Sequence, residues 1–91
     1  MFVVHDISGG RCSTRDYGNV AQFFRAKPLF AKAKHEPIFK ECVERGFMYT
    51  SEYSINIPGG PILINSYHKT LNELQDEVAY NRNVSDIKDV K

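Results

Sequence analysis

The loop over residues 8–18, SGGRCSTRDYG, contains the side chains of this chain that could most readily do chemistry. Cys12 lies between Arg11 and Arg15, and nearby guanidinium groups favour the reactive thiolate form of a cysteine. A thiol-dependent enzyme using Cys12 would also need a base, such as His5 or His68, oriented by a third group such as Asp6 or Asp16. The spacing matches neither a Walker loop, nor the dinucleotide fingerprint, nor the phosphate loop of tyrosine phosphatases. We therefore expect no catalytic residue, and the Cys12 enzyme stays a less favoured alternative.

The remaining histidines and cysteines do not form a recognisable metal site. His5, His35 and His68 are scattered, without the spacing that places two ligands on one ion. Cys12 and Cys42 are too few for a disulfide scaffold or a zinc site, and both should be free thiols in a reducing compartment. We expect no metal and no cofactor, with Cys42 as a small core residue.

The charge of the chain is unevenly distributed. Residues 1–34 carry six basic and two acidic side chains, a net charge of +4, whereas residues 35–91 carry six basic and nine acidic ones, a net charge of −3. Such asymmetry favours an electrostatically guided contact through the N-terminal third, and Tyr and Arg are common at binding hot spots. The predicted partner-binding residues are Arg11, Arg15, Tyr17, Arg25, Lys27, Lys32 and Lys34.

Nucleic-acid binding is the alternative use of the same basic residues. Phe23, Phe24 and Phe30 are interleaved with them, and such a pattern can bind phosphates and stack bases. Helical spacing of the three phenylalanines instead favours a role in the core, and the chain as a whole has a net charge of only +1. A protein partner is therefore the better hypothesis.

The element that must position these residues is a β-hairpin over 47–67. Alternation of apolar and polar residues from Phe47 to Ile57 predicts a strand with one dry face. A turn at Pro58-Gly59-Gly60-Pro61 returns the chain, and a four-residue loop closed by Ile57 and Ile62 is favoured because neither proline can donate a hydrogen bond. This register places Ile55 opposite Ile64 and Tyr53 opposite Ser66.

Other segments supply a third strand and the helices. Residues 2–7 predict a strand that joins the hairpin, followed by the loop. Asn19 with Gln22 predicts a capped helix that ends before Pro28, and residues 28–35 fit a second short helix better than a strand. Pro37 begins a helix that ends at Gly46. Thr70 with Glu73 predicts a final helix through about residue 82.

Together these segments predict one α+β domain over 1–82 with a polar, frayed C-terminal tail over 83–91. The expected order is β-α-α-β-β-α, with a small, mainly antiparallel three-stranded sheet and helices packed on one face. No apolar run could span a membrane and the N-terminus lacks signal-peptide character, so we expect a cytoplasmic protein. The exposed sheet edges could also recruit a second copy as a homodimer.

The function that the sequence favours is a small intracellular regulatory or inhibitory protein that acts by binding another protein. Small, motif-free chains of this kind are common among the accessory proteins of phages and mobile elements, which makes such a role part of the hypothesis. A nucleic-acid-binding module is the first alternative. The sequence identifies neither the partner nor the process.

Overall fold

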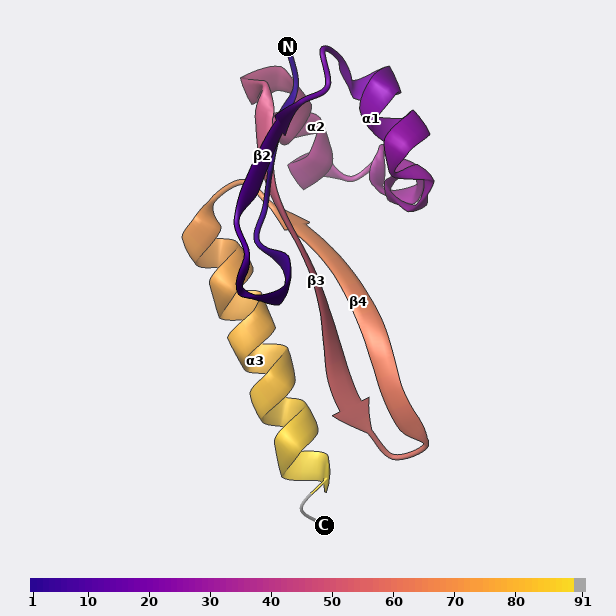
Figure 1. Cartoon of the computed structure of the whole chain (residues 1–91), viewed down its shortest axis with the longest axis vertical. Coiled ribbons are helices and arrows are strands. Elements are labelled where there is room, and N and C mark those ends of the chain that lie inside the picture. Colours follow the sequence, from indigo (N-terminus) through magenta and orange to yellow (C-terminus); the bar gives the residue numbers. More distant parts are fainter. Residues whose placement is uncertain (90–91) are drawn as a thin grey trace.

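A computed structural model describes the backbone of residues 1–89 and the side chains of residues 1–83. The molecule is elongated, with extents of 46 × 25 × 23 Å. Figure 1 shows a long hairpin flanked by one long helix, with shorter helices gathered at one end. The elements are β1 (Val3–Asp6), η1 (Ser8–Gly10), β2 (Ser13–Asp16), α1 (Val20–Ala26), η2 (Pro28–Ala33), α2 (Pro37–Arg45), β3 (Phe47–Ile57), β4 (Gly60–His68) and α3 (Leu71–Asp89).

The predicted α+β class is confirmed, but the sheet has four strands and is mixed. Its order is β2-β1-β3-β4, with β1 parallel to β3 and antiparallel to β2. The segment over residues 2–7 does join the hairpin as predicted. The prediction missed β2, which was expected to be loop, because its four side chains are all exposed and so leave no apolar pattern in the sequence.

The hairpin forms as predicted, but its turn is tighter. Ile57 pairs with Gly60, and Ile55 pairs with Ile62, so the loop contains only Pro58 and Gly59. Gly59 has a φ of 103°. Proline at the first central position and a glycine with positive φ at the second are the residues that a type II turn requires. The predicted pairing of Ile57 with Ile62 was therefore wrong by two residues, a shift that leaves every side chain on its predicted face.

Helices cover both faces of the sheet, not one as predicted. Met48 and Thr50 are buried on the face that meets α1, η2 and α2, whereas Ser51 and Tyr53 are buried on the face that meets α3. Near its middle, β3 therefore has buried side chains on both of its faces. The prediction of helices on one face was wrong because it was based only on the face of β3 where most apolar residues lie.

The aromatic core lies between the sheet and the three shorter helices. Phe23 is fully buried, with ring centroids 5.4 Å from Phe2, 5.3 Å from Tyr17 and 5.4 Å from Phe30. The Phe39 ring lies 5.3 Å from that of Tyr67 on β4. The remaining members of this core are Val4, Ala33, Cys42 and Met48.

The predicted helix signals are confirmed. Asn19 accepts a hydrogen bond from the backbone N–H of Gln22 at 2.9 Å, and Thr70 accepts one from Glu73 at 3.2 Å. The segment after Pro28 is a 3₁₀ helix, which resolves the alternative between helix and strand. The helix after Pro37 ends at Gly46, which has a φ of 87°.

The last helix is longer than predicted. Its backbone remains helical through Asp89, where the sequence predicted a frayed tail from residue 83. Residues 90–91 of that predicted tail lie outside the described residues. Within the described part of the chain, no helix has the length and apolar character needed to cross a membrane.

Candidate functional site

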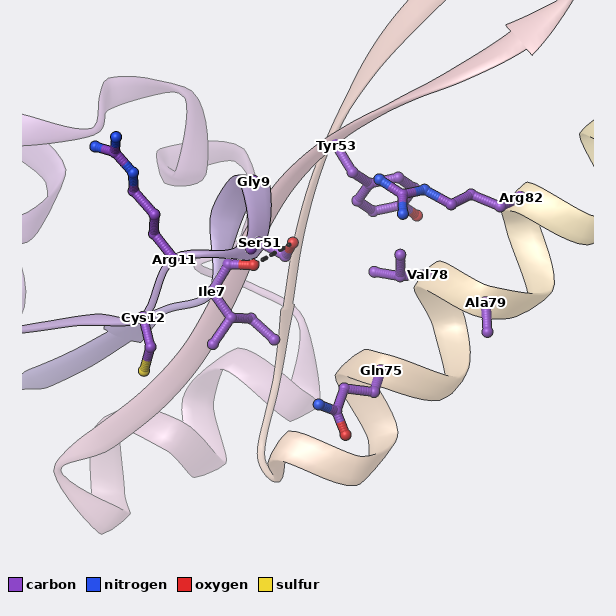
Figure 2. Close-up of a pocket in the computed structure, with 11 residues that line it drawn as sticks. Ile7, Gly9, Arg11, Cys12, Ser51, Tyr53, Gln75, Val78, Ala79 and Arg82 are labelled. Atoms are coloured by element: carbon purple, nitrogen blue, oxygen red, sulfur yellow. Dashed lines mark hydrogen bonds between the residues drawn. The ribbon is translucent and has the colours of Figure 1, made fainter.

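A groove of about 610 Å³ lies between α3 and the loop that follows β1. Its volume falls in the range of protein ligand sites, roughly 300–1,000 Å³. Figure 2 shows α3 forming one wall, β3 the floor, and the loop with Gly9, Arg11 and Cys12 the opposite wall. The lining residues are Ile7, Gly9, Gly10, Arg11, Cys12, Ser51, Tyr53, Gln75, Val78, Ala79 and Arg82.

The loop wall is fixed to the sheet by hydrogen bonds. Ser8 Oγ donates to Asp6 Oδ1 at 2.6 Å and accepts from the backbone N–H of Glu52 at 2.8 Å. The backbone N–H of Ile7 donates to the carbonyl of Thr50 at 2.9 Å, and Ser51 Oγ donates to the Ile7 carbonyl at 3.5 Å (Figure 2). These bonds hold the loop beside β3 and so keep the groove open on that side.

The turn of the loop depends on glycine backbone conformations. Gly9 and Gly10 have φ values of 59° and 76°, which residues with a Cβ adopt at a cost. This turn lets the backbone N–H of Arg11 donate to the Ser8 carbonyl at 3.0 Å. The chain then leaves toward β2, with Arg11 and Cys12 exposed at the outer rim of the groove.

The helix wall presents Gln75, Val78, Ala79 and Arg82, which recur along one side of α3. The Arg82 guanidinium lies 5.8 Å from the centroid of the Tyr53 ring, within the range of a cation–π contact (Figure 2). The floor and walls are therefore partly apolar, with the Arg82 guanidinium over Tyr53, whereas the Arg11 side chain extends from the loop wall away from α3 (Figure 2).

A polar cluster under α3 anchors this wall to the sheet. Glu77 accepts hydrogen bonds from Tyr53 Oη at 2.9 Å and from Ser66 Oγ, and its other oxygen lies 2.9 Å from His68 Nε2. Asn81 Nδ2 donates to Tyr53 Oη at 2.7 Å. Burial alone would raise the pKa of Glu77, but the hydrogen bonds from Ser66, His68 and Tyr53 outweigh it and hold this pKa below its ordinary value.

The charge of the groove is positive although the chain is nearly neutral. Its lining contains Arg11 and Arg82 and no carboxylate. Glu77, an acidic side chain on the same helix, is turned into the polar cluster and bonded there. A ligand that carries a carboxylate or a phosphate would thus meet cationic groups without an opposing charge in the lining.

The predicted basic residues are all exposed but do not converge on one site. Arg11 lines the groove, whereas Arg15 and Lys27 line a separate cavity of about 290 Å³ beside Thr50. Lys34 lies at another cavity, of about 340 Å³, on α1 and α2. Arg25 and Lys32 lie on α1 and η2 and line none of these three cavities.

Tyr17 is more buried than its place in the exposed loop over 8–18 predicted. It is 9% exposed and its ring packs against Phe23, although it also lines the cavity that Arg15 and Lys27 line. The backbone N–H of Tyr17 donates to the Phe2 carbonyl at 2.9 Å, which draws the end of β2 over the core. Arg15 covers the outside of this ring, with its guanidinium 5.0 Å from the ring centroid.

Cys12 is exposed and Cys42 is buried in the core, as predicted for Cys42. Both bases that a Cys12 enzyme could use have other partners. His5 Nδ1 lies 2.9 Å from Thr14 Oγ1, with its ring stacked on Tyr49, and His68 is bonded to Glu77. Within the described residues, no group of three or more His, Cys, Asp or Glu is placed to hold a metal ion.

Sequence reasoning missed the residues that α3 brings to the groove. The sequence around Gln75, Val78 and Arg82 indicated only an amphipathic helix. Their position over β3 results from the tertiary packing of α3 against the sheet. Tyr53 was predicted as a core residue, which is correct, but its hydroxyl also bonds Glu77 and its ring carries Arg82.

The fold and the site together define a small α+β domain with a mixed four-stranded sheet and a cationic groove. The chain belongs to the family described as "Protein of unknown function (DUF3045)", whose model matches residues 1–90. It is 48% identical over 86 residues to the "Uncharacterized 10.8 kDa protein in Gp30-rIII intergenic region" of Enterobacteria phage T4, covering 93% of this chain and 92% of that protein. No solved structure matches it significantly.

Proposed function

We propose that the protein is a phage accessory protein that acts in the host cytoplasm by binding another protein and regulating or inhibiting it. The phage relative supports this setting. The binding site that we propose is the groove between α3 and the loop after β1. Its occupant is an extended segment of the partner that carries at least one acidic side chain.

The observation that carries the proposal is the composition of the groove lining. Arg82 stands over Tyr53 in the helix wall, Arg11 lies at the rim of the loop wall with its side chain extending outward, and the lining contains no carboxylate (Figure 2). Ile7, Val78 and Tyr53 supply apolar surface between the two walls. Arginine is the residue best suited to bidentate recognition of a carboxylate. An acidic side chain flanked by small apolar ones matches this arrangement in both charge and character.

A binding role agrees better with this site than a catalytic one. Cys12 lies at the rim, and the two histidines that could activate it are bonded to Thr14 and Glu77. The nucleic-acid alternative loses its base-stacking component, because Phe23 and Phe30 are core residues and Phe24 packs against that core. Exposed lysines and arginines would then have to supply phosphate contacts alone.

Photo-cross-linking from Cys12 tests the proposal in host lysate. Cys12 is exposed at the rim and Cys42 is 1% exposed, so a thiol-specific benzophenone reagent should label the folded protein at Cys12. We expect one defined protein adduct, reduced about tenfold or more by Arg82→Glu and partly retained by Arg82→Lys, which keeps the charge.

Two matched controls give this experiment its meaning. Arg25→Glu changes the charge by the same amount on α1, outside the groove, and should leave the adduct unchanged. Moving the thiol to the exposed Ser54, in a Cys12→Ser background, should abolish it. An adduct that is insensitive to Arg82→Glu, or one formed with nucleic acid instead of protein, would overturn the proposal. Circular dichroism checks that each variant is folded.

A further inference from the structure

The two edges of the sheet are protected to very different degrees. β2, at one edge, is four residues long and carries the charged Arg15 and Asp16. β4, at the other edge, is nine residues long and contains no Lys, Arg, Asp or Glu. Short length and charged side chains are the usual means by which proteins prevent edge-to-edge pairing. Only β2 has them.

The backbone of β4 offers free hydrogen-bonding groups along this edge. Pro61 pairs with Asn56 but has no N–H, so this pair must be of the type without hydrogen bonds, and the Pro61 carbonyl points away from β3. Because backbone direction alternates along a strand, the N–H and C=O groups of Leu63 and Asn65 also point away from β3. Figure 1 shows no element beside this outer edge of the distal hairpin.

Apolar side chains are exposed at the same place. Leu63 is 61% exposed and Ile62 is 43% exposed, on opposite faces of β4. Ile62 lies on the face that α3 covers, yet it remains exposed because the hydrogen bonds of α3 through Tyr53 hold the helix over β3. Among the described residues, Ile62 and Leu63 at the margin of the sheet are therefore left uncovered on both faces, which leaves room for another strand.

We propose that β4 pairs antiparallel with β4 of a second copy, about a two-fold axis at Leu63. This arrangement sets Leu63 opposite Leu63 of the second copy and Ile62 opposite Ile64, so apolar residues meet apolar residues and no like charges face each other. Pairing β4 with β2 of another copy would instead be head-to-tail and open-ended, and would leave two further edges exposed. The symmetric pairing closes, and it forms one continuous eight-stranded sheet.

The pairing surface is small, so the dimer should be weak. Five paired residues on each copy bury less surface than a standard stable interface, and we expect dissociation in the micromolar range. Analytical ultracentrifugation over a range of concentrations measures it directly. Leu63→Lys places two ammonium groups at the axis and should weaken the dimer about tenfold or more. The matched variant Val43→Lys, on the exposed side of α2 away from the hairpin tip, should not.

Disulfide capture tests the geometry. In a Cys12→Ser background, Leu63→Cys should form a disulfide-linked dimer on mild oxidation, because opposed residues of paired strands have suitable Cα separations. Ser54→Cys in the same background should not, since the two β3 strands would be about 14 Å apart across two β4 strands. A protein that stays monomeric at every concentration, or a dimer unaffected by Leu63→Lys, would overturn the proposal.

Discussion

The two faces of the sheet are covered by helices that use different chemistry. On one face, α1, η2 and α2 close over an aromatic core with Phe23 at its centre, and the contacts there are dispersion and ring packing. On the other face, α3 is held by the fully buried Leu74 and by the polar cluster around Glu77. Apolar packing depends little on pH, whereas a bonded carboxylate depends on its ionisation.

This difference assigns different roles to the two layers. The aromatic face fixes the fold, because its rings are excluded from water almost completely. The α3 face forms a wall of the groove, so the orientation of that wall depends on directional hydrogen bonds from Tyr53, Ser66 and His68. The stability of the protein and the shape of its proposed binding site should therefore respond to different substitutions.

The largest effect is expected from removing the central ring of the aromatic face. Phe23→Ala should lower the free energy of unfolding by about 3–5 kcal/mol, since the side chain is fully buried and a cavity would remain. Urea denaturation followed by circular dichroism measures the loss. The matched variant Leu29→Ala, at a residue that is 53% exposed, should change the free energy by less than about 0.5 kcal/mol. A loss below 1 kcal/mol for Phe23→Ala would contradict this role of the aromatic face.

A smaller loss is expected from the polar face. Glu77→Gln keeps the shape of the side chain but leaves at least one of its three donors without an acceptor, at a cost of about 1–3 kcal/mol. Glu73→Gln is the control, because Glu73 is 47% exposed and its Oε2 lies 3.8 Å from His68 Nδ1. Equal losses for the two variants would show that the cluster does not hold α3.

The smallest effect is the pH dependence of the same cluster. The pKa of Glu77 is lowered in the folded protein, so its contribution is complete above the ordinary glutamate pKa of about 4.3 and is lost as the pH falls through the lower folded value. Thermal unfolding at pH 7 and pH 3 should therefore differ less for Glu77→Gln than for the natural protein. If the pH dependence of the two proteins is the same, Glu77 is not the group that titrates.

The hairpin shows what sequence pattern can predict. Side-chain parity from Phe47 to Ile57 correctly divided the residues between two faces, because a period of two is a property of the strand itself. It did not predict that Met48 and Thr50, on the face expected to be polar, are buried. The exact pairing depended on which residues enter the turn, and Pro58 with Gly59 forms a shorter turn than expected. Local pattern thus predicted the faces, while turn geometry decided the register.

The parts that the sequence could not predict depend on contacts between distant segments. β2 forms because its backbone pairs with β1. Its side chains are all exposed, so the sequence has no apolar alternation that would indicate a strand. Tyr17 was expected at the surface because it lies within a polar loop, yet the end of β2 carries its ring onto Phe23. The groove was half predicted: Arg11 was identified from its loop, whereas Arg82 reached the site only through the docking of α3.

The position of β1 in the sheet has a consequence for the order of folding. β1 is an interior strand, but its parallel partner β3 comes late, and Ile7 and Ser51, which are bonded across this junction, are 44 residues apart in the chain. During synthesis, β1 can pair with β3 only after α2 and β3 have left the ribosome, whereas β2 is available earlier. Contacts of such long sequence separation slow folding, so completion of the sheet is expected to follow formation of the β3–β4 hairpin.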